Sequence, residues 1–322
     1  MAREINTPQK IAILGAGLMG TGIAYVFAAN RHSVQLYDIS AERLDSAKEN
    51  LQKIADVFRL AGRAEEQCEQ ANERIAMTPD LHAALSGANI VIEAVSELAE
   101  VKADVFRQVS ERAPANAAVW SNTSSLDVFE LAPEFLQSRL LIAHWFAPAH
   151  ILPLVELVPG PHTQPHLIGE ADALLATMGK IPVKLDRYVP GFIINRLLRA
   201  LGREAFYLID NGYVTAADLD RAVKASLAPR MMVLGVMQRY DFTGLDLSAQ
   251  NFKNDKFVDA PVDLAPRVLV ERVNRGELGV KTGRGFYDYQ GMSVHEASKR
   301  RDELLLGVLD SCSRIVSTER SI

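Results

Sequence analysis

A histidine and a glutamate in neighbouring apolar segments are the residues of this sequence best suited to move a proton. His144 ends one expected strand, and Glu156 lies inside the next, within the apolar run 151–158. A glutamate in a buried strand is costly unless it is paired. A carboxylate that holds one imidazole nitrogen fixes the tautomer and leaves the other nitrogen as a general base. The pair predicts acid–base chemistry, although a lone histidine at a strand end is also typical of a structural group.

Two further polar residues are candidates for holding a reacting oxygen. Ser124 follows the strand signal at 118–121, and Asn195 lies near the start of a predicted helix. Polar groups at the carboxyl ends of the strands of an open α/β sheet line the crevice where ligands bind. The open alternatives are a helix cap for Ser124 and a structural role for Asn195.

A glycine-rich turn near the start of the chain could hold a dinucleotide. The residues Gly15-Ala16-Gly17-Leu18-Met19-Gly20 follow an apolar strand and open a predicted helix. The first glycine allows the tight turn, the second lets the backbone approach a pyrophosphate, and the third lets helix and strand pack closely. The helix start offers N–H groups and partial positive charge to the phosphates, so we expect Gly15, Gly17, Leu18, Met19 and Gly20 at the cofactor. The alternative is a glycine turn that packs only against its own sheet.

Acidic residues after two strands bear on which dinucleotide binds. Asp38 ends the second predicted strand, 23 residues after Gly15, and no basic residue follows it directly. A carboxylate there accepts from ribose hydroxyls and repels a 2′-phosphate, which predicts NAD rather than NADP. Glu93 and Glu97 follow the fourth strand and are candidates for the nicotinamide-ribose side, with solvated acids as the equal alternative.

The elements that must position these residues fall into two parts. Residues 1–188 alternate strand and helix signals, which predicts a Rossmann-type doubly wound parallel sheet, with a helical hairpin inserted at 41–76. Residues 189–322 show helical periodicity and predict an all-helical domain, with helices at 192–211, 215–226, 231–239 and about 296–317. The first of these helices is apolar on more than one face, which predicts burial in a core or in an interface between chains.

Composition excludes several classes of protein. The 322 residues are 48% hydrophobic and 23% charged, as in folded globular domains, with a net charge of −5. That charge argues against nucleic-acid and anionic-membrane partners. The apolar stretch 11–29 holds four glycines and is not read as a membrane span. The two cysteines have no metal-ligand spacing, so we expect no metal and a cytoplasmic location.

Beyond these single motifs, the chain resembles the L-3-hydroxyacyl-CoA dehydrogenase family over nearly its whole length. The resemblance is carried by eight ordered segments: 15–20, 91–95 with Val101-Lys102, 121–126, 144–148, 153–156, 190–196, 241–246 and 281–287. It implies an NAD-binding domain, a helical domain that forms a homodimer, His144 as the base with Glu156 as its partner, and Ser124 and Asn195 at the substrate oxygen. Within these motifs, Lys102 and Asn122 are expected at the cofactor.

Two departures from the family pattern concern the substrate. Ala147 stands where the family usually has asparagine, and Pro153 stands where acyl-CoA members tend to have a basic residue. Ala147 removes a polar contact, while Pro153, with His144-Trp145 and the run 153–156, resembles the non-CoA branch that includes L-gulonate 3-dehydrogenase (lambda-crystallin), carnitine dehydrogenase and pyridine-carboxylate dehydrogenase. The hairpin, where family members contact the CoA moiety, offers four bases that are also typical of a solvated face: Lys48, Lys53, Arg59 and Arg63.

Three functions follow from the sequence. The first is NAD-dependent oxidation of an L-3-hydroxyacyl-CoA, or reduction of the 3-keto form, as in fatty acid metabolism. The second is the same reaction on a small free hydroxy acid. The third is a non-catalytic NAD-binding or structural protein, against which the complete set of Ser124, His144, Glu156 and Asn195 argues. Chain length of the substrate and the physiological direction stay open.

Overall fold

A computed structural model describes residues 7–60, 62, 64–289 and 291–318. The chain divides into two compact units, with the division between Asn195 and Arg196. The sequence places the domain boundary seven residues earlier, after residue 188. Arg63 lies outside the described residues.

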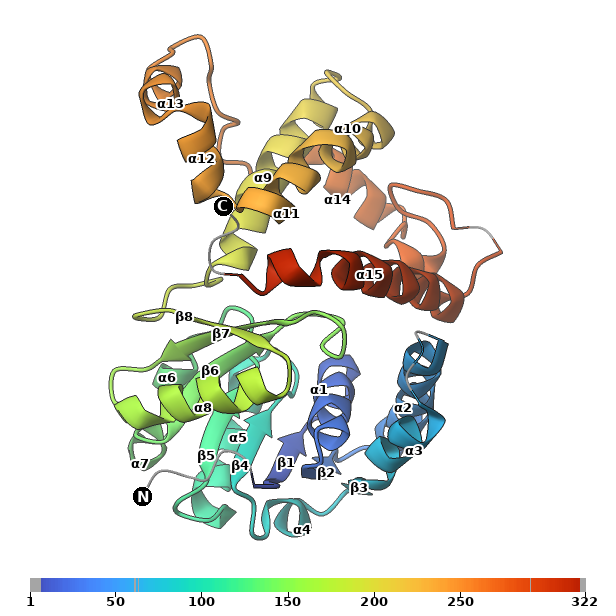
Figure 1. The fold of residues 1–322 in the computed structure, drawn as a ribbon, viewed down its shortest axis with the longest axis vertical. Coiled ribbons are helices and arrows are strands. Elements are labelled where there is room, and N and C mark those ends of the chain that lie inside the picture. Colours follow the sequence, from blue (N-terminus) through green and yellow to red (C-terminus); the bar gives the residue numbers. More distant parts are fainter. Residues whose placement is uncertain (1–6, 61, 63, 290, 319–322) are drawn as a thin grey trace. The chain divides into compact units, whose positions relative to one another are not determined.

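The first unit is built on one eight-stranded sheet (Figure 1). The strand order is β3-β2-β1-β4-β5-β6-β7-β8. The bounds of the strands are β1 Lys10–Leu14, β2 Ser33–Tyr37, β3 Ile75–Thr78, β4 Ile90–Glu93, β5 Ala118–Ser121, β6 Leu140–Trp145, β7 Leu154–Pro159 and β8 Ile181–Lys184. From β3 to β6 all neighbours pair in parallel, so the carboxyl ends of these strands meet at one edge of the sheet.

One edge of the sheet departs from the expected parallel arrangement. Strand β7 runs antiparallel to β6, and β8 runs parallel to β7. Only residues 146–153 connect β6 to β7, and a parallel crossover needs a dozen or more residues. The reversal brings the beginning of β7, where Glu156 lies, beside the end of β6, where His144 lies.

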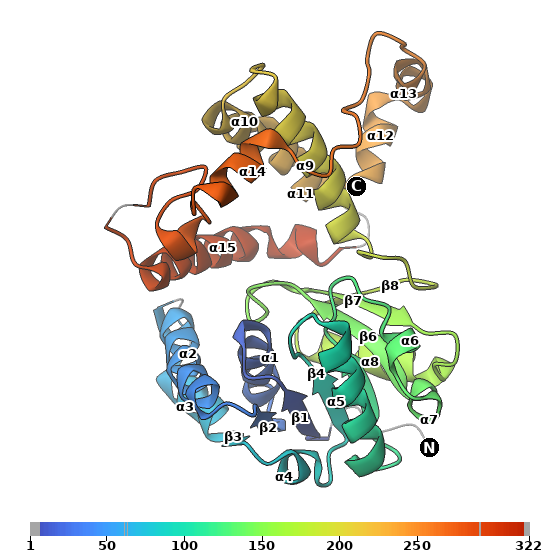
Figure 2. The same cartoon turned by 180° about the vertical axis from the view of Figure 1, so that it is seen from behind.

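Helices cover both faces of this sheet, as the fold class predicts. The helices of the first unit are α1 Leu18–Ala29, α2 Ala41–Leu60, α3 Glu65–Glu73, α4 Leu81–Leu85, α5 Ala99–Arg112, α6 Val128–Leu131, α7 Glu134–Gln137 and α8 Pro165–Thr177. Figures 1 and 2 show α1 and α8 on one face and α5 on the other. The core on the α5 side includes Ala12 and Leu14 of β1 with Phe106 and Val109 of α5. Because side chains alternate along a strand, Ile11 and Ile13 are buried on the opposite face.

The expected helical hairpin is present between β2 and β3. It consists of α2 and α3, and both helices pack against α1. The rings of Tyr25 on α1 and Phe58 on α2 stack at 5.4 Å between centroids. Buried positions Ala47, Leu51, Ile54 and Ala55 follow the helical period along α2. The apolar periodicity of 41–60 therefore reflects packing against the first helix of the sheet.

The second unit is helical apart from isolated bridges. Its helices are α9 Ile194–Asp210, which starts at the end of the first unit, then α10 Ala216–Ala222, α11 Ala228–Leu234, α12 Met237–Thr243, α13 Leu245–Phe252, α14 Arg267–Asn274 and α15 Val294–Val316, with a π-helical turn at Val223–Leu227 and a 3-10 turn at Val280–Thr282. The prediction of a single helix over 231–239 is wrong. Gly235 adopts φ 66°, a conformation that ends α11, and α12 begins two residues later.

The second unit lacks a core of its own within the chain. Of its described residues, only Ala260, Val268 and Asp302 are buried. No residue of α9 is buried, and its Leu197, Leu198 and Leu201 are each close to half exposed. The apolar pattern of α9 therefore does not mark a core helix of a single chain. None of the helices in the described ranges is apolar over a stretch long enough to cross a membrane.

Candidate active site

His144 and Glu156 form a buried pair between β6 and β7. The two residues are direct partners in the strand register, and His144 Nδ1 lies 2.8 Å from Glu156 Oε2. Glu156 is fully buried and His144 is 5% exposed. Because a carboxylate only accepts hydrogen bonds, the neutral form of this imidazole carries its proton on Nδ1 and a lone pair on Nε2. Nε2 has no hydrogen-bond partner among the described residues, so it is available to accept a proton.

The second carboxylate oxygen of Glu156 holds the start of α9. Glu156 Oε1 accepts from the backbone N–H groups of Ile193 at 2.9 Å and Ile194 at 3.0 Å. A helix start carries unpaired N–H groups and partial positive charge, which stabilise a buried carboxylate. The ring of Phe192 packs against the imidazole of His144 at 5.2 Å between centroids. The residue that orients the base therefore also anchors the segment that carries Asn195.

The glycine turn has the shape and the free donors that a pyrophosphate needs. Gly15 has φ 110°, and an added Cβ would lie 2.5 Å from the carbonyl oxygen of Ala94. An added Cβ on Gly20 would lie 1.8 Å from the carbonyl oxygen of Gly15, whereas one on Gly17 would meet open space. Gly17 caps α1 without any side-chain hydrogen bond, and the first turn of the helix holds no acid. Open space at Gly17 therefore lies at the start of α1, where backbone N–H groups are available to a phosphate and no acid stands in the first turn of the helix.

Asp38 lies beside this turn, directly after β2. Its Oδ2 accepts from the backbone N–H of Ala16 at 2.9 Å, and its Oδ1 accepts from that of Ser40 at 3.1 Å. These bonds hold the carboxylate against the glycine turn. Each carboxylate oxygen keeps a second acceptor site for a ribose hydroxyl. The arrangement suits NAD, because a carboxylate at this position accepts from ribose hydroxyls and repels a 2′-phosphate.

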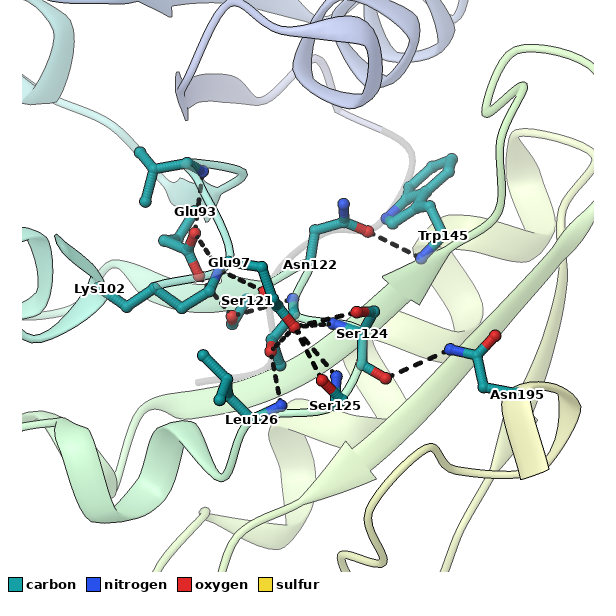
Figure 3. Close-up of polar contacts among 12 residues, drawn as sticks. Glu93, Glu97, Lys102, Ser121, Asn122, Ser124, Ser125, Leu126, Trp145 and Asn195 are labelled. Atoms are coloured by element: carbon teal, nitrogen blue, oxygen red, sulfur yellow. Dashed lines mark hydrogen bonds and ion pairs between the residues drawn. The ribbon is translucent and has the colours of Figure 1, made fainter. Parts of the chain in front are cut away.

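A serine loop (residues 121–126) follows β5 and is organised around one carboxylate (Figure 3). Glu97 Oε1 accepts from the Thr123 hydroxyl at 2.8 Å, from the Ser124 backbone N–H at 2.7 Å and hydroxyl at 3.0 Å, and from the Ser125 backbone N–H at 3.0 Å. Burial alone raises the pKa of Glu97, but the ammonium of Lys102 and the bonds from Thr123 and Ser124 lower it to about 2. Glu97 is therefore an anion that holds the serine loop in place.

Glu93 and Lys102 lie beneath this loop rather than at its surface. Their side chains are 0% and 1% exposed. Lys102 Nζ contacts Glu93 Oε1 at 2.7 Å and Glu97 Oε2 at 3.2 Å, while the Ser121 hydroxyl donates to Glu93 Oε2. Direct contact of Glu93 and Lys102 with the cofactor stays a prediction. In the structure Lys102 links Glu93 to Glu97.

Two asparagines connect the serine loop to the other parts of the site. Asn122 Oδ1 accepts from the backbone N–H of Trp145, the residue after His144, at 2.9 Å. Asn195 Nδ2 donates to the carbonyl oxygen of Ser124 at 3.3 Å. Figure 3 shows both contacts. The fold thus brings together the segments that carry all four expected catalytic residues, although they are up to 71 positions apart in the chain.

Matches to known proteins extend over both units. Residues 10–188 match the family described as "3-hydroxyacyl-CoA dehydrogenase, NAD binding domain", and residues 191–289 match "3-hydroxyacyl-CoA dehydrogenase, C-terminal domain". The chain belongs to the 3-hydroxyacyl-CoA dehydrogenase family. As a member of this family it is an NAD-dependent oxidoreductase that acts on a CH–OH group. The sequence-based expectations of family, fold class, enzyme class and cofactor are confirmed.

Similar members of the family differ in the substrate their names state. The 5-formyl-3-hydroxy-2-methylpyridine 4-carboxylate 5-dehydrogenase of Mesorhizobium japonicum is 32% identical, over 93% of this chain and 97% of that protein. A probable 3-hydroxybutyryl-CoA dehydrogenase of Bacillus subtilis is also 32% identical, over 88% of this chain and 98% of that protein. A crystal structure of a 5-dehydrogenase of the first kind, described as an NAD⁺-dependent dismutase, matches with a TM-score of 0.84 and 30% identity, over 95% of this chain and 99% of that one.

Some contributors to this dehydrogenase site were missed in the sequence. Thr123 and Ser125 share Glu97 with Ser124, and the Tyr188 hydroxyl donates to the carbonyl oxygen of Ser125 at 2.6 Å. The clustered hydroxyls of Ser121-Asn-Thr-Ser-Ser125 were a visible signal, whereas nothing near Tyr188 in the chain indicated its contact. Within the described ranges, no group of three His, Cys, Asp or Glu residues is arranged to hold a metal ion.

Proposed function

We propose that this enzyme oxidises the hydroxyl of a 3-hydroxy compound, or reduces the corresponding ketone, with His144 as the general base. NAD, when bound, supplies the acceptor for the hydride. The single observation that carries the proposal is the 2.8 Å contact between His144 Nδ1 and fully buried Glu156, which leaves Nε2 free. In the oxidative direction Nε2 accepts the hydroxyl proton, and Glu156 stabilises the imidazolium that forms.

Ser124 and Asn195 are proposed to hold the substrate oxygen in attack geometry. Glu97 supports this role because it holds Ser124 by both its backbone N–H and its hydroxyl. For the cofactor we propose direct contacts from the glycine turn, Asp38 and Asn122. The burial of Glu93 and Lys102 supports a positioning role for both, exerted through Glu97.

For the substrate we propose a free hydroxy acid, with the CoA thioester as the second candidate. CoA carries several phosphate charges, which need basic partners. Residues 41–73 hold eight acids and five bases. Of the bases expected at CoA, Lys53 lies 3.8 Å from Glu49, and Arg59 lies 3.1 Å from Asp56 and 3.8 Å from Glu65. These ion pairs and the overall negative charge favour a solvated hairpin over a phosphate site.

We propose a homodimer formed through the second unit. A domain of about 120 residues buries well over half of the surface of its unfolded chain when it is stable. The three buried residues of this unit fall far short of that, and apolar side chains such as Phe257 and Leu264 are 69% and 81% exposed. A second copy of the same chain would cover these side chains by the symmetric association that is commonest among soluble oligomers. A cytoplasmic location stays a prediction.

A substrate panel with the purified chain tests the function. We expect NADH formation from free 3-hydroxy acids with a kcat/KM at least tenfold above that for 3-hydroxybutyryl-CoA, and almost none from either with the His144→Ala variant. A higher kcat/KM for the thioester would select the second candidate. Near-normal turnover by a folded His144→Ala variant would contradict the mechanism.

A further inference from the structure

Lys180 is a buried amine that the site described above does not use. It lies between α8 and β8 and is 8% exposed. A buried charge is costly unless it is compensated. Lys180 forms no ion pair with a carboxylate in the described part of the chain. Its Nζ instead donates to the carbonyl oxygens of Ala149 at 2.7 Å and Leu152 at 2.9 Å, and it lies 5.2 Å from the ring centroid of Trp145.

All three contacts of Lys180 belong to one short stretch of chain. Ala149 and Leu152 lie in the 146–153 loop, which joins the strand of His144 to the strand of Glu156. Trp145 is the residue directly after His144. A loop without strand or helix pairing must satisfy its carbonyl groups in some other way. Two of them converge on the single ammonium group of Lys180, so the loop conformation depends on that group.

The same loop contacts both the base and the cofactor helix. The ring of Phe146 packs edge-on against His144 at 4.4 Å between centroids. On its other side the loop lies against α1, where a Cβ added to Gly22 would come within 3.3 Å of Ala149 Cβ. Helix α1 starts at the glycine turn. A shift of the 146–153 loop would therefore move His144 relative to the glycine turn, where we expect the cofactor.

We infer that Lys180 is a positioning residue for His144, acting through the 146–153 loop and Trp145. The inference rests on the proposed role of His144 as base. The ammonium bonds two loop carbonyls and faces the Trp145 ring, and this fixes the backbone that directly follows His144. A misplacement of about 1 Å in such a site can cost on the order of 100-fold in rate.

The test compares Lys180→Met and Lys180→Arg with the control Lys184→Met. The methionine keeps the approximate length of the side chain and removes the donors and the charge, whereas arginine keeps both. Lys184 ends β8, the strand that follows Lys180, and its side chain is 49% exposed and pairs with Asp172 at 2.8 Å. We expect Lys180→Met to lower kcat at least tenfold with KM and NAD affinity within threefold. Lys184→Met should match the unmodified chain, and Lys180→Arg should recover part of kcat.

The pH profile separates positioning from a general structural role. Burial lowers the pKa of Lys180 to about 8, and no charged side chain contributes to that shift. The titratable and charged groups on the surrounding elements are His144 at the end of β6, His150 in the loop, Glu170 and Asp172 on α8, and Lys184 at the end of β8. Above pH 8 the neutral amine keeps two donors but loses its charge, so we expect kcat of the unmodified chain to fall severalfold. The side chain of Lys180→Arg stays charged in this range, so its kcat should not fall above pH 8. Lys180→Met should have a low kcat that shows no fall above pH 8.

Hydrogen exchange gives a readout that does not need turnover. Amides of residues 146–153 should exchange at least tenfold faster in Lys180→Met than in the unmodified chain or in Lys184→Met. Unchanged exchange, or kcat within twofold of normal with an unchanged pH profile, would overturn the inference. If Lys180→Met does not fold, an alkaline fall that persists in Lys180→Arg would overturn it instead. Loss of the proposed function itself would appear separately, as an unmodified chain that turns over no 3-hydroxy substrate.

Discussion

The Glu156→Gln substitution changes one atom of the site and should remove the base. The amide is nearly isosteric with the carboxylate, but it offers one acceptor where the carboxylate offers two. In the structure Oε1 accepts from two backbone N–H groups, of Ile193 and Ile194, and Oε2 accepts from His144 Nδ1. The glutamine oxygen satisfies either the two backbone donors or the imidazole, but not both.

The hydrogen-bond count decides which orientation glutamine adopts. If its oxygen faces Ile193 and Ile194, both backbone bonds survive, and its NH₂ group faces His144 Nδ1. A donor at that position requires Nδ1 to be the acceptor, so the proton moves to Nε2 and the base is lost. The opposite orientation leaves two part-buried N–H groups without a protein acceptor, at about 1–3 kcal/mol each. The inactive tautomer is therefore favoured by about 2–6 kcal/mol, which corresponds to roughly 30- to 10⁴-fold in rate.

The assay is kcat for NADH formation by Glu156→Gln, with Glu111→Gln as the matched control. Glu111 carries an exposed ion pair with Arg107, so its loss should leave kcat unchanged. Because the two backbone bonds of residue 156 survive, we expect only a small change in thermal stability and NAD affinity. A folded Glu156→Gln protein with kcat within threefold of normal would refute the reasoning about the tautomer.

Three further outcomes follow from the geometry. Gly17→Ala should fold normally, because its Cβ meets open space, yet NAD binding measured by calorimetry should weaken at least tenfold. Gly20→Ala should instead lower the melting temperature, because its Cβ meets backbone. The reverse pattern would contradict the proposed binding of the cofactor at the glycine turn. The pKa of Glu97 is held near 2, below its ordinary 4.5, so its stabilising contribution is complete above pH 4.5 and is lost as pH falls toward 2. Solvent screening reduces this contribution to about 2 kcal/mol. The free energy of unfolding should therefore fall less steeply below pH 4.5 in Glu97→Gln than in the unmodified chain. Leu201→Glu should convert the dimer to a monomer in sedimentation velocity; a monomeric unmodified chain would contradict the proposed assembly.

Several features of the site were predictable because their causes are local or energetic. The glycine turn and Asp38 follow short strands directly, so their placement needs only the order of strand, turn and helix. The pairing of His144 with Glu156 was predictable for another reason: a glutamate in an apolar strand needs a partner, and the preceding strand offered one. The fully buried Glu156 and the 2.8 Å contact agree with that reasoning.

Other features depended on which elements cover one another, and sequence alone did not decide them. Glu93 follows a strand just as a cofactor-binding acid would, yet Lys102 and Ser121 enclose it completely. The apolar pattern of α9 is the same for a core helix and an interface helix, because both bury apolar side chains away from water. Only the tertiary structure shows that the described part of this chain buries no residue of α9 completely.

The sequence by itself determined the periodicities, the turn chemistry and the residue types, because hydrophobic burial and backbone sterics act over a few neighbouring residues. The tertiary structure decided the direction of β7, the burial of Glu93 with Lys102, and the convergence of two loop carbonyls on Lys180. These features depend on contacts between residues far apart in the chain. The free energy of each such contact depends on which groups are buried from water against one another. A local sequence pattern does not contain that information.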